Sequence, residues 1–392
     1  MKRRLLPLAV LTSAIFASGL ELAESARRPR YGGTLRMEIG AKIDSLDLDV
    51  AAATPDADAA KAQLEPLVYD VLEPKTKSRV NGAFHVTAFE AGERVVLAAT
   101  EDYRQGRPFV DTIEITMGRA AHDRVLDLEL NKTDFAEIPA EEARRAAERG
   151  VRLSRSQPDE LMALVFTGGA EPGRGALADK RLREALALSI DRAAIVNFIL
   201  QKEGEPAGGL LPQWSSGTAF LLSTATDPVH AKELSAQIVP VPKIVLGYDS
   251  GDSLEQAVAE RIVVNAREAG IAVVARAIRP PVGKIDARIV RLMMQSKNPA
   301  LAFEGIADEL GTMMKVNDTA LPNSATPEQI YGRERAIVSS YRVVPLVWLP
   351  QVYGLSAWVR DWTPPGPGET WPLADVWLDG LRDGGAAEEG KK

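Results

Sequence analysis

The sequence predicts an α/β protein with two lobes, and three observations support this prediction. Short β-branched segments alternate with amphipathic helical segments along the chain, and no internal repeat of fixed period is present. One complete strand–helix–strand unit stands out at residues 243–278. The length of 392 residues, 45% of them hydrophobic and 26% charged, suits a soluble globular chain with more than one core.

The first 26 residues predict a signal peptide and leader. The basic stretch KRR precedes an apolar run, and Ala17 and Gly19 supply the small residues of a cleavage site, although cleavage nearer Ala26 also fits. An uncleaved membrane anchor is the alternative. The apolar run is shorter than the ~20 residues of a spanning helix, and no later segment is apolar enough to span a membrane.

Charge and cysteine usage narrow the class of protein. The chain has no cysteine, which excludes disulfides, thiolate metal sites and an N-terminal lipid anchor. Its net charge of -7 argues against nucleic acid as a partner. We therefore expect a free periplasmic protein, monomeric, with a disordered tail at residues 381–392.

A glycine-led strand and an acidic turn follow the leader in the stretch YGGTLRMEIGAKIDSLDLD, residues 31–49. Ligands of open α/β sheets bind outside the carboxyl ends of strands, so a polar turn at this position is well placed for binding. Asp47 is therefore a candidate ligand contact. The alternative is an ordinary capped turn in which the Asp47 carboxylate accepts backbone N–H groups.

Two helices are predicted in the stretch LADKRLREALALSIDRAAIVNFIL. Asp179 can cap the first helix, and Leu182, Ala185 and Leu186 begin its buried stripe. Asp191 can cap a second helix that carries apolar residues such as Ile195.

Residues 243–278 form the predicted strand–helix–strand unit. Ser253 and Gln256 stand at capping-box spacing, and the helix that they open has Leu254, Val258 and Ile262 on one face. Gly270 supplies a helix stop before the strand of residues 271–278. Such a unit implies a parallel strand pair with a right-handed crossover.

Motifs of enzyme or metal chemistry are missing from the sequence. The three histidines lie far apart, and none has metalloprotease-type spacing. No G-x-S-x-G elbow or S-x-x-K set is present, and the loop GYDSGDS lacks dinucleotide-binding spacing. We predict no catalytic residue, no metal site and no cofactor.

Aromatic residues supply further ligand candidates. Five of the six tryptophans, Trp348 among them, crowd the last part of the chain, where most are expected to pack in cores. Trp214 follows two glycines and a proline in a loop, so its ring can close over a ligand; burial in the core is the alternative. Trp348, Phe220 of the Trp214 loop, and Tyr353 complete the aromatic candidates.

The chain resembles the extracellular solute-binding protein family 5, the peptide-, nickel- and oligosaccharide-binding subunits of ABC importers. The stretch DKRLREALALSIDRAAIVNFIL…GEPAGGLLPQW resembles the family's signature. Further stretches agree in order with its first strand, its central strands and its C-terminal return, VVPLVWLPQVYGLSAWVRDW. The resemblance implies a type II periplasmic-binding-protein-like clamp with mixed sheets and flanking helices. Lobe 1 is expected at residues 27–170 plus 345–380, and lobe 2 at 171–344.

Two departures from the family qualify this resemblance. A small extra domain of on the order of 100 residues normally follows the stretch resembling LEPLVYDVL, but here residues 75–79 lead almost directly into VNGAF, which indicates a trimmed member. The region that carries a tryptophan and an aspartate in peptide binders contains no tryptophan here and offers Arg288 and Arg291. Either arginine can pair with a ligand carboxylate, although on a strand only one can reach it; solvated surface arginines are the alternative.

We therefore expect a periplasmic protein that captures a small solute or peptide between two lobes and delivers it to an ABC permease. A sensor or interaction protein on the same scaffold is the alternative, and a hydrolase is a distant third.

Overall fold

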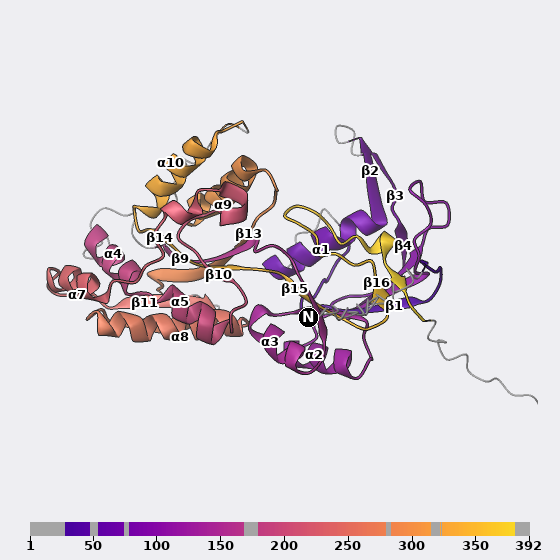
Figure 1. Ribbon diagram of the computed structural model, residues 1–392, viewed down its shortest axis with the longest axis horizontal. Helices are drawn as coiled ribbons and strands as arrows, with labels where there is room; N and C mark the ends of the chain where they lie inside the picture. Colours follow the sequence, from indigo (N-terminus) through magenta and orange to yellow (C-terminus); the bar gives the residue numbers. More distant parts are fainter. Residues whose placement is uncertain are drawn as a thin grey trace, which may run out of the picture.

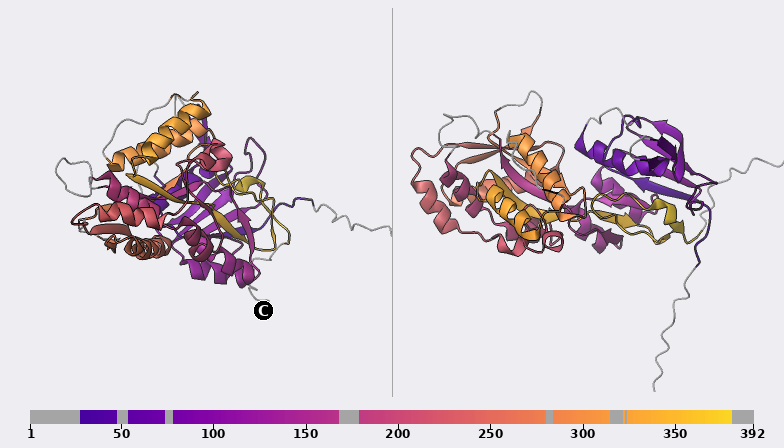
Figure 2. Two further views of the ribbon diagram at one scale, coloured as in Figure 1. Left: turned by 60° about the vertical axis from the view of Figure 1, so that its left-hand side comes forward. Right: turned by 90° about the horizontal axis from the view of Figure 1, so that it is seen from above.

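The computed structural model describes residues 28–47, 54–73, 78–167, 179–279, 284–314, 322 and 324–380. The chain forms two lobes side by side along the longest axis of the molecule, each built on a mixed sheet flanked by helices (Figures 1 and 2). The α/β class that the sequence predicts is confirmed. None of the helices within these described ranges is long and apolar enough to cross a bilayer.

Lobe 1 contains a seven-stranded sheet in the order β4-β5-β6-β1-β7-β15-β8. Strand β1 runs parallel to β6 and β7, and the other neighbouring strands are antiparallel. Helix α1 covers one face of this sheet, and α2 and α3 lie on the opposite side (Figure 1). The bounds are β1 (Thr34–Glu38), β4 (Phe84–Glu90), β5 (Arg94–Ala99), β6 (Thr112–Thr116), β7 (Phe135–Ile138), β8 (Arg152–Arg155), β15 (Val352–Leu355), α1 (Pro55–Val68), α2 (Ala121–Glu129) and α3 (Ala140–Glu148).

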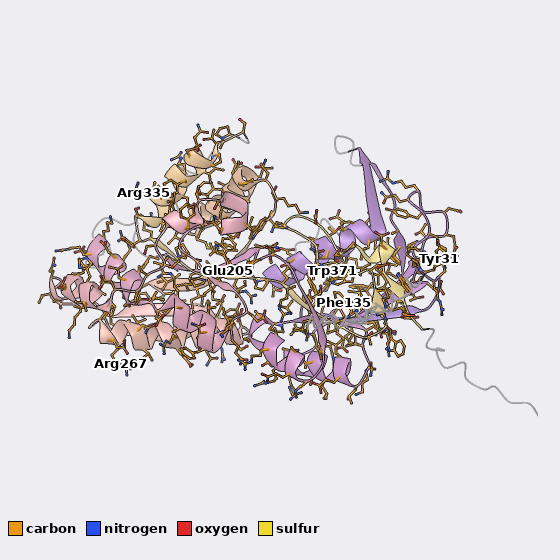
Figure 3. The ribbon with its side chains drawn as sticks, viewed as in Figure 1. Tyr31, Phe135, Glu205, Arg267, Arg335 and Trp371 are labelled. Carbon is orange, nitrogen blue, oxygen red and sulfur yellow. The ribbon has the colours of Figure 1, made fainter. Side chains whose placement is uncertain are left out.

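The C-terminal part of the chain completes the core of lobe 1. Strands β16 (Val359–Arg360) and β17 (Trp377–Leu378) pair with each other, and a 3-10 turn, η4 (Leu373–Asp375), precedes β17. Trp371 packs 6.3 Å from Phe135, centroid to centroid, inside the lobe (Figure 3). Residues 352–380 are therefore structural parts of the same lobe as β1.

Lobe 2 contains a six-stranded sheet in the order β10-β14-β9-β13-β11-β12. Strands β11, β12 and β13 are parallel, and β9, β14 and β10 are antiparallel to their neighbours. The bounds are β9 (Glu160–Phe166), β10 (Glu205–Pro206), β11 (Ile244–Asp249), β12 (Val273–Ile278), β13 (Ala287–Met293) and β14 (Val343–Leu349).

Strand β9 is buried on both faces because helices cover both sides of the second sheet. Its residues alternate between two cores: Leu164 packs toward α4 and α8, whereas Val165 packs toward α9. Figure 1 shows α8 below this sheet and α9 and α10 above it. The helical bounds are α4 (Lys180–Ser189), α5 (Arg192–Ala194), the π-helix η2 (Ile195–Ile199), α6 (Gln213–Ser216), η3 (Ala219–Leu221), α7 (Pro228–Ala236), α8 (Ser253–Glu268), α9 (Pro299–Met314) and α10 (Pro327–Val338).

The strand–helix–strand unit predicted at residues 243–278 is confirmed as β11, α8 and β12, with β11 and β12 parallel. The predicted capping box is wrong by one residue. Asp252 caps α8, since its carboxylate accepts the Glu255 N–H at 2.9 Å. Gly270 ends the unit's helix with φ +75, as the sequence predicts.

The two predicted caps near residues 179 and 191 are also confirmed. The Asp179 carboxylate accepts the Arg181 N–H at 2.9 Å, and the Asp191 carboxylate accepts the Ala194 N–H at 2.8 Å. Arg192 then reaches into the lobe and donates to the Pro345 carbonyl oxygen at 2.8 Å. Burial lowers the pKa of Arg192 to about 10. This hydrogen bond connects the segment of α4 and α5 to strand β14.

The two boundaries between lobe 1 and lobe 2 differ from those expected from the sequence. In the second sheet β9 lies between β13 and β14 and pairs with both, whereas we expected residues 160–166 and 345–349 in lobe 1. Local patterns could not reveal this, because the pairing joins segments more than 100 residues apart. Between Val68 and Phe84 the described residues form a hairpin of β2 (Tyr69–Glu73) and β3 (Ser78–Asn81), which agrees with a trimmed family member.

The glycine pair that precedes the Trp214 loop is explained by close packing. Glu334 of α10 is fully buried, and its carboxylate accepts the N–H groups of Leu210 and Leu211. A Cβ on Gly209 would collide with that carboxylate, and one on Gly208 with the Leu222 carbonyl. Glycine is therefore required where the loop crosses α10.

This packing predicts that Gly209→Ala destabilises the protein while Gly332→Ala does not. The new methyl at 209 would displace the buried Glu334 carboxylate, which should cost ~1–3 kcal/mol. Gly332 lies within α10 with open space at its Cβ position, so alanine there should add up to ~1 kcal/mol. Denaturant unfolding of both variants measures the difference. Equal stability of the two variants would contradict this account of the loop.

Candidate functional site

The chain crosses between the two sheets at two neighbouring segments. Residues 156–159 connect β8 to β9, and residues 350–351 connect β14 to β15. The Ser156 N–H donates to the Gln351 carbonyl oxygen at 2.9 Å, and the Asp159 N–H donates to the Leu349 carbonyl oxygen at 3.1 Å. The crossing segments therefore lie side by side, and together they form the covalent joint between the lobes.

Asp159 is the buried charge-bearing residue of this joint. Its side chain is 1% exposed, and the Ser156 hydroxyl and the Gln351 amide each lie 3.5 Å from its carboxylate oxygens. Burial, with a smaller contribution from the neighbouring Glu160 carboxylate, raises the pKa of Asp159 to about 7. The joint thus contains a carboxyl group that holds its proton in the folded protein up to near-neutral pH.

The carboxyl ends of parallel strands from the two sheets meet beside the joint. Glu141 lies in the first turn of α3, which follows β7, and Ser253 begins α8, which follows β11. The Ser253 hydroxyl donates to the Glu141 carboxylate at 3.3 Å. Burial raises the pKa of Glu141, and the nearby Asp252 carboxylate raises it further. Ligands of α/β sheets bind at such edges, so the boundary between the lobes is the candidate binding region.

A proline-rich loop of lobe 1, residues 363–372, touches lobe 2 away from the joint. Glu369 forms an ion pair with Lys297, which precedes α9, and this pairing lowers the pKa of Glu369. Gly368, with φ +73, lies so close to the Gln295 carbonyl that a Cβ would collide with it. The side chain of Gln63 in α1 accepts the Trp371 N–H at 2.9 Å, which holds the loop on lobe 1. The two lobes therefore meet at the joint and again at this loop.

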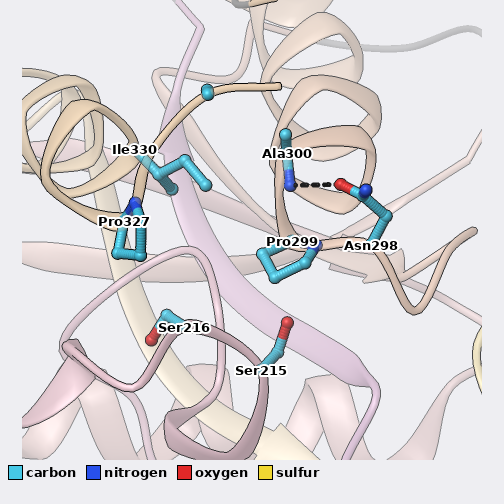
Figure 4. A pocket seen from close by; sticks show the side chains of 8 residues that line it. Ser215, Ser216, Asn298, Pro299, Ala300, Pro327 and Ile330 are labelled. Atoms are coloured by element: carbon cyan, nitrogen blue, oxygen red, sulfur yellow. Dashed lines mark hydrogen bonds between the residues drawn. The ribbon is translucent and has the colours of Figure 1, made fainter. Parts of the chain in front are cut away.

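Two pockets lie near this boundary. One, of about 250 Å³, is on lobe 2 between α6 and the starts of α9 and α10 (Figure 4). The other, of about 460 Å³, is on lobe 1 between Pro66 of α1 and the loop 363–372.

Three of the residues that the sequence proposed as ligand contacts gather at the joint. The Trp214 indole N–H donates to the Pro158 carbonyl oxygen at 2.7 Å, and the ring is 37% exposed. Arg291 holds Glu160 through two hydrogen bonds of 2.6 and 2.8 Å, and it also pairs with Asp252 at 2.8 Å. The Tyr353 hydroxyl donates to the Gln351 side chain at 2.6 Å. These residues come from β13, β15 and α6, which the fold brings together.

Of the other four candidates, three are exposed and one lies inside a core. Asp47 is exposed in the turn after β1, and Phe220 is 74% exposed in η3. Arg288 is exposed on β13, three residues before Arg291 and on the opposite face of the strand. Trp348 is 2% exposed in the core between β14 and α9.

Trp348 and Tyr353 were expected as ligand contacts, but both side chains are buried in this structure. Tyr353, 1% exposed, packs 5.3 Å from both Phe135 and Trp362 in lobe 1. In this structure both aromatic rings fill cores, because β14 and β15 are central strands covered on both faces.

Sequence reasoning missed Asp159, Lys297 and Glu369. Asp159 precedes the apolar run ELMALVF, and an aspartate before a strand reads as an ordinary turn residue. The ion pair joins residues 72 positions apart. No local signal marks either feature.

The fold and this boundary define the class of a two-lobe binding protein, and comparison with known proteins specifies the family. Residues 31–320 match the model of the bacterial extracellular solute-binding proteins, family 5. The chain belongs to this family, which is one of binding proteins.

Curated relatives include the oligopeptide-binding protein AppA of Bacillus subtilis, 30% identical over 127 residues, and the nickel-binding protein NikA of Staphylococcus aureus, 25% identical over 177 residues. These matches cover 32% and 43% of this chain, and 23% and 34% of the relatives' own length.

Among solved structures, the periplasmic binding protein DppA of Helicobacter pylori, in complex with the peptide STSA, superposes with a TM-score of 0.69 at 12% identity. The match covers 90% of this chain and 99% of that one. The NikA structure from Brucella suis gives a TM-score of 0.64 at 16% identity, over 76% of this chain and 68% of that one. These likenesses confirm the two-lobe fold.

The raised pKa of Asp159 predicts a pH-dependent effect of Asp159→Asn. The unfolded chain loses this proton near pH ~4, whereas the folded protein keeps it to about pH 7. Stability is therefore lost as the pH rises from ~4 to about 7, and the full penalty applies above that. Asparagine cannot ionise, so the variant should exceed the wild type by up to ~4 kcal/mol at pH 8 and match it at pH 4.

Denaturant unfolding of the ligand-free protein at both pH values measures this difference. Glu38, Glu255 and Glu334 also have pKa values raised to about 7 by burial. The free energy of unfolding should therefore still fall with rising pH in Asp159→Asn, but less steeply than in the wild type. A variant whose stability differs from the wild type equally at both pH values would contradict the assignment.

Proposed function

We propose that this protein is the periplasmic solute-binding component of an ABC importer, which captures a short peptide or another small solute between its lobes and delivers it, as a monomer, to the permease. The observation that carries the proposal is the double crossing between two sheets whose carboxyl ends face each other. The names of the relatives, which include oligopeptide- and nickel-binding proteins, support this class of ligand.

The proposed mechanism is binding followed by closure, and no bond is made or broken. The two lobes are joined by short crossing segments, and their further contacts include exposed ones such as Lys297–Glu369, whose side chains are 57% and 52% exposed. An exposed ion pair of this kind contributes only ~0–1 kcal/mol, so it opposes separation of the lobes only weakly. A ligand that contacts both lobes stabilises the closed state alone, and the permease can then distinguish loaded from empty protein.

The size of the pockets favours a short ligand of moderate size, and the ion pairs of Arg291 bear on its charge. The pockets near the boundary, about 250 and 460 Å³, are each too small for a large solute. Arg291 is already engaged by Glu160 and Asp252, so pairing with a ligand carboxylate requires it to exchange partners. Native mass spectrometry of the freshly purified protein tests the proposal directly, since captured ligand should appear as a defined added mass. A protein that carries no ligand and binds none from a periplasmic extract would overturn it.

The proposed export through the leader gives a prediction about where the protein is found. If residues 1–26 direct secretion and are cleaved, the mature protein should be released by osmotic shock without detergent, because it has no cysteine for a lipid anchor. Fractionation followed by N-terminal sequencing checks both points. Recovery only in the membrane fraction would contradict cleavage.

The proposed contact of Trp214 with the ligand gives a further prediction, with Trp358 as the matched control. The Trp214 ring is 37% exposed at the joint, and the Trp358 ring is 40% exposed elsewhere on lobe 1. Truncating a binding anchor costs ~2 kcal/mol, so Trp214→Ala should weaken ligand binding roughly 30-fold. Trp358→Ala should leave the affinity unchanged.

Calorimetry with the ligand identified by mass spectrometry measures the affinities, and thermal unfolding without ligand measures stability. A large fall in melting temperature for Trp214→Ala with unchanged affinity would show that the indole supports the joint rather than the ligand.

A further inference from the structure

The pocket of about 250 Å³ on lobe 2 is smaller than a complete small-molecule site, which is ~300–1,000 Å³. It can therefore hold one part of a ligand. Segments from three helical elements of lobe 2 form its walls (Figure 4). The lining residues are Ser215, Ser216, Asn298, Pro299, Ala300, Ala325, Pro327 and Ile330.

None of these lining residues carries a charge. The two helix starts at the pocket are already capped: the Asn298 side chain accepts the N–H groups of Ala300 at 2.9 Å and Leu301 at 3.3 Å, and Thr326 caps α10. These N–H groups are thus not offered to an anion. A charged group placed there would lose its hydration without gaining a counter-charge, which is costly. The pocket favours an uncharged group.

Its apolar surface comes from proline, alanine and isoleucine side chains, and Ala300 and Ile330 are 2% and 4% exposed. Such a wall suits an aliphatic group, since burying carbon against it removes apolar surface from water.

One polar atom in the wall is unsatisfied. Ser215 Oγ is buried and has no hydrogen-bond partner within the described part of the chain. Figure 4 shows this hydroxyl directed toward Pro299 across the pocket. The neighbouring Ser216 Oγ, by contrast, donates to the Pro212 carbonyl and accepts the N–H groups of Thr218 and Ala219. A buried hydroxyl without a partner is costly, so a ligand that supplies one gains from it.

The pocket is placed near the boundary between the lobes. Trp214, which bonds the crossing segment at Pro158, directly precedes Ser215. Lys297, which pairs with Glu369 of lobe 1, directly precedes Asn298. A ligand between the lobes can therefore extend one group into the pocket.

We propose that this pocket binds one uncharged aliphatic side chain of a peptide ligand, with the Ser215 hydroxyl hydrogen-bonding the adjacent peptide amide. This inference rests on the proposed function and names the specificity of the same binding region. According to this proposal, residues of lobe 2 determine which ligands bind most tightly.

Four tripeptides test the proposal by calorimetry on the mature, ligand-free protein: Ala-Leu-Ala, Ala-Ala-Ala, Ala-Glu-Ala and Ala-Lys-Ala. Ala-Leu-Ala should bind about tenfold more tightly than the other three, because only leucine fills the apolar pocket. Ala325→Leu fills the pocket from the protein side and should abolish that preference. Ala236→Leu, at an exposed position on α7, is the matched control and should preserve it.

Ser215→Ala tests the hydrogen bond and should weaken binding of Ala-Leu-Ala about fivefold. If the peptides bind but Ala325→Leu keeps the wild-type preference, or if a charged peptide binds as tightly as Ala-Leu-Ala, the pocket assignment is overturned and the proposed function stands. If none of the four peptides binds, peptide capture is overturned together with the ligand class of the pocket.

Discussion

The pairing of β9 with β13 and β14 is the constraint on which the rest of the structure depends. β9 is the first strand after one crossing, and β14 is the last strand before the other. Because these two strands are hydrogen-bonded neighbours, the two crossings must leave lobe 2 at the same edge and lie against each other. The joint, the position of Trp214 on Pro158 and the ion pairs of Arg291 all follow from that adjacency.

Buried carboxyl groups hold the segments that surround these paired strands. Glu334 holds the backbone of Leu210 and Leu211 from inside α10, and Glu255 holds the Asp249 N–H at 2.7 Å beside the carboxyl end of β11. Each replaces hydration with fixed backbone donors, and burial raises the pKa of both carboxyls to about 7. The two carboxyl groups position the loop at Leu210 and Leu211 and the end of β11, at the cost of stability near neutral pH.

Much of the fold could be predicted from the sequence where the signal is local. The Asp179 and Asp191 caps, the Gly270 stop and the strand–helix–strand unit depend on residues within one or two turns of each other. Sheet membership of β9 could not be predicted, because its partners lie more than 100 residues away.

The candidate site divides in the same way. Trp214 stood out through its loop composition, whereas Asp159, Lys297 and Glu369 matter only through distant partners. Trp348 and Tyr353 were recognised as notable aromatics, but nothing in their flanking sequence separates a core ring from an exposed one.

The order of strands in the first sheet has a consequence for the order in which the two lobes fold. β15 lies between β7 and β8, so it must be inserted between two strands that precede it in the chain by about 200 residues. Lobe 2 is built from one continuous stretch and can fold as soon as β14 emerges, whereas lobe 1 is split until β15 arrives. Since distant pairing slows folding, the first lobe of the nascent chain stays incomplete until β15 has been synthesised. Insertion of β15 is therefore the step that commits lobe 1 to its folded form, after lobe 2 has already been completed.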